Sequence, residues 1–424
     1  MIQEETYSVK GLHVHVVPTD KFKTNTVVLQ VKAPLKKETV TQRSLLANVL
    51  KSATKNHPTR KDIRLYLDEL YGASFGIDVT KKGEAHLISF RIEVANEKYL
   101  QDPSPLLTKS LEFLRDVLFD PFMENGGFSE SIITEEKRTL KQRLESIFDD
   151  KMRYANVRLI EEMCKDEPYG IHPYGSEEEI EKIGKDDLKE TYDSMINEDD
   201  FDLYVVGDVK ENELKKDIQE LFRLPEREGS LEASSASITK PEEVREVSEE
   251  QDVQQGKLNI GYRTSIIFKD ENYPAMQVMN GLFGGFPHSK LFINVREKES
   301  LAYYAASRYE SSKGLLLVMS GVDQKNYDKA LTIIKEQMKA MKDGDFSDKE
   351  IEQTKQMLKN QLLEMADVPR GLIEMFYQGV VSGKKRPLDD WLEAIDKVTK
   401  EDVIECAKTV EMDTIYFLRG KEAK

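Results

Sequence analysis

The chain has 424 residues, of which 39% are hydrophobic and 33% charged, so it is long enough for two to four domains with sizeable cores. Its 62 basic and 78 acidic side chains give a formal net charge of −16, with both signs spread along amphipathic stretches. This balance disfavours a nucleic-acid partner, which requires a clustered basic face. No stretch approaches the ~18 apolar residues of a membrane span, so no membrane partner is expected.

The N-terminus and the cysteines favour a cytoplasmic protein. Two early glutamates and the lack of an apolar run near the N-terminus argue against a secretory signal. The two cysteines, Cys164 and Cys406, lie far apart and have no second pair to complete a metal cluster or a disulfide framework. We expect both to be reduced core residues.

Hydrophobic periodicity predicts helices and strands in an α+β order. Residues 12–16 alternate, with His13 and His15 on the face opposite the apolar side chains, and we interpret that face as the wetter side of a sheet. The remaining predicted elements before residue 224 are strands at 26–31, 74–79, 86–94 and 201–206, helices at 41–51, 60–71, 106–119, 129–162 and 180–195, and a turn at 172–175.

A linker and an internal repeat divide the chain. Residues 224–244 are rich in Ser, Glu, Gly and Pro and lack periodicity, which is typical of a linker. Residues 127–144 then align without gaps on 345–362, at a constant offset of 218. These patterns predict two tandem copies of one α+β unit, each a mostly antiparallel sheet packed with helices, at 1–223 and 245–424.

One glycine-rich segment and one Cys/His pair resemble functional motifs only superficially. The sequence GLFGG at 281–285 lacks the Gly-Lys-Ser/Thr ending of a phosphate loop and follows a helical pattern, so it indicates a helix C-cap or a loop. Cys164 and His172 lack the further ligands of a zinc site, and the HPYG sequence at 172–175 indicates a turn.

Arg296 and Tyr303 form the strongest candidate site. They stand seven residues apart across a predicted junction between a helix at 289–298 and a strand that begins at 301. On spacing alone, Arg296 could be a solvated surface residue and Tyr303 a half-buried strand residue. A guanidinium and a phenol presented from one rigid corner could also donate hydrogen bonds to a peptide carbonyl as it becomes an oxyanion.

The whole chain resembles the pitrilysin/insulinase family of zinc metallopeptidases, in the subgroup of mitochondrial processing peptidase. The resemblance rests on LFINVREKESLAYYAASRY at 291–309, HPYG, VVGDV at 205–209 and the repeat. In active members, a His-x-x-Glu-His helix and a later glutamate hold zinc and the general base. Aligned on that pattern, the two histidine positions are Ser44 and Asn48, the base position is Ala47, and the third ligand position is Arg143.

These four residues cannot carry the zinc chemistry that the resemblance implies for active members. A hydroxyl and an amide are poor zinc ligands, an alanine takes no proton, and a guanidinium repels a dication. We therefore expect no metal and no hydrolysis by this chain alone. Arg296 and Tyr303, by contrast, match the pair with which the zinc-free subunit of two-chain members holds the scissile peptide, although Phe286, Pro287 and His288 replace small residues before them.

The hypothesis that follows is a zinc-free subunit that positions an unfolded peptide for a zinc-bearing paralogue in a heterodimer, with the edge of a sheet near 86–94 available for strand addition. Pairing of the chain with itself is a further option. A second hypothesis is a non-catalytic peptide-binding or scaffolding protein that keeps only the fold. A third, an independent metal enzyme, would require convergence of His13, His15, His86 or His172.

Overall fold

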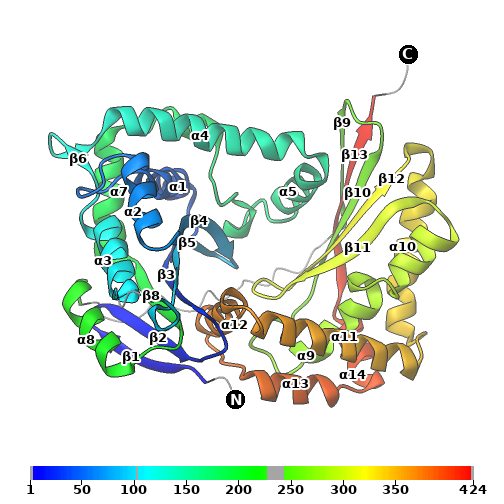
Figure 1. Cartoon of the computed structure of the whole chain (residues 1–424). Coiled ribbons are helices and arrows are strands. Elements are labelled where there is room, and N and C mark those ends of the chain that lie inside the picture. Colours follow the sequence, from blue (N-terminus) through cyan, green and yellow to red (C-terminus); the bar gives the residue numbers. More distant parts are fainter. Residues whose placement is uncertain (1–2, 102–103, 227–242, 422–424) are drawn as a thin grey trace. The chain divides into compact units, whose positions relative to one another are not determined.

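The computed structural model describes residues 3–101, 104–226 and 243–421, which form two compact units (Figure 1). Unit 1 comprises Met1–Glu145, Ile171–Ser234 and Asp367–Tyr377. Unit 2 comprises Ser146–Gly170, Ser235–Ala366 and Gln378–Lys424. Most of the predicted linker, residues 227–242, lies outside the described residues.

Unit 1 is built on a six-stranded sheet in the order β1-β2-β8-β3-β5-β4. β2 and β8 are parallel, and the other neighbours are antiparallel. Its strands are β1 (Glu5–Val9), β2 (Leu12–Pro18), β3 (Thr24–Pro34), β4 (Ser74–Lys82), β5 (Ala85–Ala95) and β8 (Asp200–Gly207). A separate two-stranded ribbon joins β6 (Met123–Glu124) and β7 (Gly127–Phe128).

The helices of unit 1 cover the apolar face of its sheet and form one continuous core with it (Figure 1). They are α1 (Lys37–Ser52), α2 (Arg60–Glu69), η1 (Glu97–Tyr99), α3 (Leu106–Phe119), α4 (Glu130–Asp149), α6 (Glu177–Ile180), α7 (Lys185–Glu198) and α8 (Glu211–Leu221). The opposite face of the sheet carries polar side chains, including Gln30 and Lys32 on β3 and Asp202 on β8, all of them buried.

Unit 2 repeats this sheet with one strand fewer. Its order is β11-β12-β10-β13-β9, and β9 and β13 form the parallel pair. The strands are β9 (Arg245–Gln251), β10 (Gly256–Arg263), β11 (Ala302–Glu310), β12 (Leu315–Val322) and β13 (Glu411–Gly420). Read from the parallel pair, both sheets place the first, fifth, second, fourth and third strands of the repeat side by side, which confirms the predicted α+β fold of two homologous domains.

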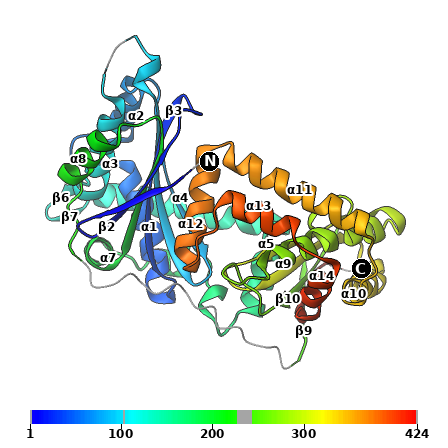
Figure 2. The ribbon, with the colours of Figure 1, turned by 90° about the horizontal axis from the view of Figure 1, so that it is seen from below.

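The helices of unit 2 include one that precedes the linker (Figure 2). They are α5 (Lys151–Met163), η2 (Pro168–Gly170), α9 (Tyr273–Asn280), the π-helical turns η3 (Gly281–Gly285) and η4 (Phe292–Lys298), η5 (Gln324–Asn326), α10 (Tyr327–Asp343), α11 (Asp348–Ala366), α13 (Leu388–Asp396) and α14 (Lys400–Lys408). The segment GLFGG thus continues helix α9 and follows no strand. Gly281 is the C-cap of α9, as expected, but the remaining residues form a π-helical turn where a cap or loop was predicted.

Equivalent helices of the repeat are exchanged between the units. Helix α5 belongs to unit 2, where it packs on β10 and β13. Its equivalent at the offset of 218 is α12 (Pro369–Ser382), whose first part belongs to unit 1, where Tyr377 stacks edge-on against Tyr204 of β8. Each unit therefore contains a segment from the opposite side of the linker.

The predicted helix at 129–162 is wrong in one detail, because the structure breaks it at Asp150. The backbone of Asp150 leaves the helical region, and its carboxylate accepts hydrogen bonds from the backbone N–H groups of Met152 and Arg153. Such an N-cap satisfies amides that have no helical partner. The break starts α5 as a separate helix and so allows it to enter unit 2.

A buried charge network holds this exchanged segment in unit 2. The Glu167 carboxylate forms ion pairs with Arg263 Nη2 at 2.6 Å and with Lys313 Nζ at 2.7 Å. Arg263 Nε forms a third ion pair, with Asp413, at 2.6 Å. The Lys313 side chain is 0% exposed. Two cationic and two anionic side chains are therefore paired in the protein interior. Removing one of them would leave an oppositely charged side chain buried without its partner.

We predict that Glu167→Gln lowers the free energy of unfolding by about 3 kcal/mol, because two buried cations lose their shared carboxylate. Urea unfolding followed by circular dichroism measures this loss. The control is Glu364→Gln on the exposed surface of α11, which should change stability by less than about 0.5 kcal/mol. Equal effects of the two substitutions would contradict a stabilising role for the network.

A second buried polar cluster lies on the polar face of the unit 1 sheet. His15 Nδ1 lies 2.8 Å from Glu4 and Nε2 lies 3.0 Å from Asp202, and the ring stacks on Tyr204. Since both acceptors are carboxylates, both ring nitrogens must donate, which describes an imidazolium. Burial lowers the pKa of His15, but the hydrogen bonds to Asp202 and Glu4 outweigh burial and raise it overall.

A raised pKa in the folded state makes this cluster sensitive to alkaline pH. The stabilisation by His15 is complete below the unfolded-state pKa of about 6.5 and is lost as pH rises through the higher folded-state pKa. We therefore predict that the stability difference between the wild type and His15→Gln is largest near pH 6 and shrinks toward pH 9. Urea titrations across this range measure it, and His13→Gln on the same strand is the matched control. A difference that grows with pH would refute the assignment.

Candidate functional site

Helix α1 carries the three positions that the resemblance aligns with the zinc motif. Ser44 and Ala47 are each 1% exposed, and Ala47 belongs to the hydrophobic core of unit 1. The Ser44 hydroxyl donates a hydrogen bond of 2.8 Å to the carbonyl of Pro173. The amide nitrogen of Asn48 is buried without a hydrogen-bond partner. None of these groups offers an imidazole or a carboxylate to a metal.

The loop at 172–175 packs directly on this part of α1. The Pro173 carbonyl also accepts a hydrogen bond from His86 Nε2 at 2.9 Å. Gly175 has a φ of +74°, and a Cβ atom there would lie 1.9 Å from Thr41 Oγ1. The loop is thus a turn, as its sequence suggested, and its glycine is required both by conformation and by the close approach to α1.

Arg143 lies on α4, on the solvent-exposed side, and meets the same loop. Its guanidinium sits 4.2 Å from the centre of the Tyr174 ring, a favourable cation–π arrangement. About two turns earlier on the same helix, the buried Glu136 carboxylate accepts hydrogen bonds from Ser52 and Arg60. The structure therefore brings Ser44 and Arg143 to one loop, where both make contacts with protein groups.

The histidines near this region are neutral structural residues. Burial, followed by the Arg43 guanidinium, lowers the pKa of His86 to about 3. Burial, with Lys81 and Arg143, lowers the pKa of His172 to about 4. Nδ1 of His86 accepts a hydrogen bond from Arg43 Nε at 3.1 Å, so both of its ring nitrogens are engaged with protein partners.

The side chains present do not fit a zinc ion. Across residues 3–101, 104–226 and 243–421, no group of three or more His, Cys, Asp or Glu side chains is arranged to hold a metal. At the aligned positions, one hydroxyl is already committed to Pro173 and one residue is a guanidinium. No metal-dependent step can be derived for these residues.

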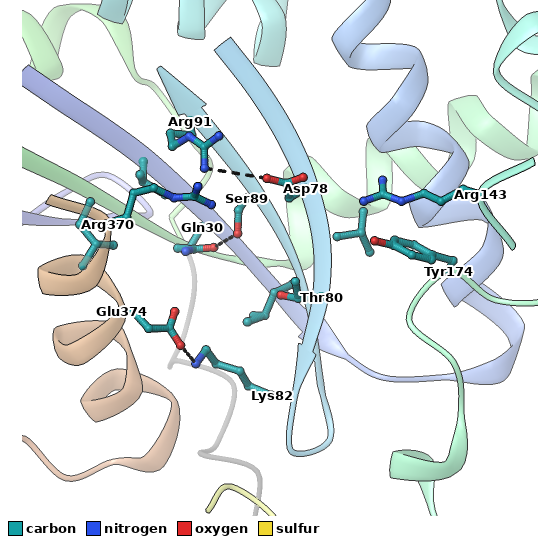
Figure 3. Close-up of a pocket in the computed structure, with 14 residues that line it drawn as sticks. Gln30, Asp78, Thr80, Lys82, Ser89, Arg91, Arg143, Tyr174, Arg370 and Glu374 are labelled. Atoms are coloured by element: carbon teal, nitrogen blue, oxygen red, sulfur yellow. Dashed lines mark hydrogen bonds and ion pairs between the residues drawn. The ribbon is translucent and has the colours of Figure 1, made fainter. Parts of the chain in front are cut away.

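A cavity of about 310 Å³ lies next to the loop, entirely within unit 1 (Figure 3). It is lined by residues of β3, β4, β5, α4, the loop and the first turns of α12. Its polar lining residues are Gln30, Asp78, Thr80, Lys82, Ser89, Arg91, Arg143, Tyr174, Arg370 and Glu374. Of these, the sequence analysis singled out only Arg143, because the strand alternation and the charged start of α12 carry no signal that they face one another.

Strand β4 forms the edge of the sheet beside this cavity. The expectation of an exposed edge at 86–94 is wrong, since β5 pairs with both β3 and β4 and lies inside the sheet. A strand with alternating apolar residues could take either position, and only the pairing decides which strand is outermost. In the described part of the chain, β4 has a backbone partner on one side only.

Arg296 and Tyr303 lie at a corner of unit 2. Arg296 lies in the last turn of η4, where its exposed side chain is 4.6 Å from the centre of the Phe292 ring. Tyr303 is 78% exposed on the edge strand β11, where the pairing with β12 is irregular between Ala302 and Ala305. Between them, Ser300 adopts a φ of +49°. A π-helical turn and a bulge are both typical of places where a fold directs a side chain outward.

A sheet-and-helix unit present in two copies is the architecture that the resemblance implies for a metallopeptidase, and in the described residues no cluster of side chains is arranged to hold a metal. Residues 182–358 match the family profile described as "Peptidase M16 inactive domain". The chain belongs to this M16, or pitrilysin, family, which confirms the resemblance.

Individual relatives agree with this assignment. The chain is 52% identical over 413 residues to "Probable inactive metalloprotease YmfF" of Bacillus subtilis (strain 168), covering 97% of this chain and 96% of that one. It is 23% identical to "Uncharacterized zinc protease YmxG" of the same organism, covering 70% and 72%. A crystal structure of a conserved protein from Enterococcus faecalis V583 is 36% identical, with a TM-score of 0.92 over 99% of both chains. The similarity groups the chain with the inactive metalloproteases of the family.

Within the described residues, no helix is long and apolar enough to span a membrane. Cys164 and Cys406 are both buried, and neither forms a disulfide in the described part of the chain. Burial raises the pKa of the Cys406 thiol to about 12, which keeps it protonated and unreactive near neutral pH.

We predict that the purified chain holds far less than one zinc per molecule and that 1,10-phenanthroline leaves its thermal midpoint unchanged, because the aligned positions offer no zinc ligands. Elemental analysis and thermal unfolding with and without the chelator make the measurement. A zinc-bearing protease of the same family, treated in parallel, is the positive control. Stoichiometric zinc that resists dialysis would overturn this account.

Proposed function

We propose that this chain is the zinc-free subunit of a heterodimeric peptidase and that it binds and positions an unfolded peptide for a zinc-bearing paralogue. The fold supports the proposal because it keeps the sheets and helices of the family at full length. The four aligned positions, in contrast, have lost the chemistry. Both an inactive chain and a zinc protease of this kind are named in Bacillus subtilis.

The observation that carries the proposal is the exposure of Tyr303. A tyrosine normally buries most of its ring, since the ring is its main contribution to stability. Here the ring is 78% exposed on an edge strand. In the described part of the chain, the side chains of Tyr303 and Arg296 form no hydrogen bond or ion pair, although the Arg296 guanidinium lies over the Phe292 ring. Within the described residues, the hydrogen-bond donors of both side chains are therefore not used by the fold.

These donors suit one step of peptide hydrolysis. As water adds to the scissile carbonyl, its oxygen gains negative charge, and donors aimed at that oxygen lower the barrier. The Tyr303 hydroxyl and the Arg296 guanidinium would supply such hydrogen bonds, while the partner would supply zinc, water and base. The Arg296 charge would also strengthen its hydrogen bond relative to a neutral donor.

A backbone hydrogen bond and two buried side chains hold the turn that carries Arg296 and Tyr303. The backbone N–H of Leu301 donates to the carbonyl of Val295 at 3.1 Å, which closes the turn between η4 and β11. Both Val295 and Leu301 are buried. The anchors on either side of Ser300 therefore limit how far Arg296 and Tyr303 can move relative to each other, and such preorganisation is what an oxyanion site requires.

We predict that the chain, co-expressed with a zinc-bearing paralogue from the same genome, gives a complex with peptidase activity, and that Tyr303→Phe lowers kcat by about 100-fold, the usual effect of removing one oxyanion donor. Steady-state kinetics on an unfolded peptide measure this.

The matched control for this experiment is Tyr304→Phe. Tyr304 is the next residue on β11, and its buried hydroxyl has no hydrogen-bond partner in the structure. Its loss should leave kcat within about twofold of wild type. The scaffold hypothesis predicts the contrary pattern: Arg296→Ala and Tyr303→Phe would leave the partner's activity intact, while deletion of the chain would destabilise the assembly.

A further inference from the structure

The cavity of unit 1 carries an excess of positive charge. Its lining holds four cationic side chains, Lys82, Arg91, Arg143 and Arg370, against two carboxylates, Asp78 and Glu374. Lys82 pairs with Glu374, and Arg91 lies 4.0 Å from Asp78. The lining therefore has a formal surplus of two positive charges, in a chain whose net charge is −16.

The charge surplus in the cavity contrasts with the buried ion-pair network of unit 2, which serves stability. In the network around Glu167, two cations meet two carboxylates and the charges balance. In the cavity, the side chains of Arg370 and Arg143 are exposed, and the Arg143 guanidinium lies over the aromatic ring of Tyr174. Exposed ion pairs contribute little to stability, so an unbalanced cluster here needs another explanation.

The floor of the cavity is also suited to a polar ligand. The Ser89 hydroxyl donates to Gln30, and Thr80 contributes another hydroxyl beside them. Figure 3 shows Arg370 extending from α12 toward Gln30 and Ser89, while Arg143 and Tyr174 point toward strand β4 from its other side. Guanidinium groups and hydroxyls of this kind bind carboxylates through charge-assisted hydrogen bonds.

The edge strand β4 would fix the direction of a bound peptide and the side on which its side chains lie. Asp78, Thr80 and Lys82 alternate along β4 on the cavity side. A peptide that added to the free edge of β4 would place every second side chain over the same face, since strand side chains alternate between faces. One such side chain would reach the surplus of positive charge.

We propose that this cavity is a specificity pocket that binds a carboxylate of the bound peptide, either an Asp or Glu side chain or the C-terminal carboxylate. The pocket selects acidic peptides through Arg91 and Arg370, which lie on the same side of β4 as Gln30 and Ser89. The inference rests on the proposed peptide-binding function and adds a substrate class to it.

The test uses the full chain and three decapeptides of Thr, Val, Ser and Gln, each carrying the same neutral dye joined to its N-terminal amine through an amide bond. The first has one central Glu and an amidated C-terminus, the second has Gln in place of that Glu, and the third has the central Gln and a free C-terminal carboxylate. Fluorescence anisotropy at low salt measures each Kd. We expect one of the two carboxylate peptides to bind at least about fivefold more tightly than the neutral peptide, and the tighter one identifies the source of the carboxylate.

Substitutions then localise the preference. Arg370→Gln should reduce it about threefold and the double variant Arg91→Gln/Arg370→Gln should abolish it, while binding of the neutral peptide stays unchanged. The matched control is Arg64→Gln, which removes the same charge from an exposed position on α2 outside the cavity. Raising NaCl should reduce the preference, because exposed charge interactions are screened.

The contrary outcomes separate the two proposals. Equal affinities for all three peptides would overturn the specificity pocket and leave the peptide-positioning function standing. A preference that Arg64→Gln reduces as much as Arg370→Gln would mean attraction by overall charge and would also overturn the pocket. If none of the peptides binds and the complex with the paralogue has no activity, both proposals fail.

Discussion

Each sheet of this protein has two faces that must be covered by other elements. Each unit therefore includes a helical segment from the opposite side of the linker. Helix α5 packs on β10 and β13 in unit 2, and the first part of α12 belongs to unit 1. The exchange follows from the N-cap at Asp150, which ends α4 and releases α5. Because α5 and α12 are equivalent in the repeat, one structural solution serves both units.

The two units use charge in opposite ways. Unit 2 buries a balanced set around Glu167, where every charge has a partner and the cost of desolvation is offset. The cavity of unit 1 leaves positive charge in excess beside an unpaired strand edge. The proposed recognition of a peptide rests on this cavity and on the exposed Tyr303.

Much of the fold and part of the candidate site could be predicted from the sequence. The offset of 218 predicted two homologous units. The loss of zinc chemistry at positions 44, 47, 48 and 143 stays a prediction from residue types, because ligand chemistry depends on side-chain identity. The edge strand was predicted wrongly. Alternating apolar residues at 86–94 describe a strand, but its place in the sheet depends on long-range pairing with β3 and β4.

The sequence by itself determined the class of the protein, the duplication and the identity of the chemical groups at each position, since these are properties of residue types and their spacing. Only the tertiary structure decided that α5 and α12 are exchanged, that Ser44 and Arg143 meet one loop, and that Arg91 and Arg370 line one cavity. Some of these juxtapositions join residues more than two hundred positions apart, as in the pairing of Lys82 with Glu374. The packing of the folded chain, which local periodicity does not encode, sets them.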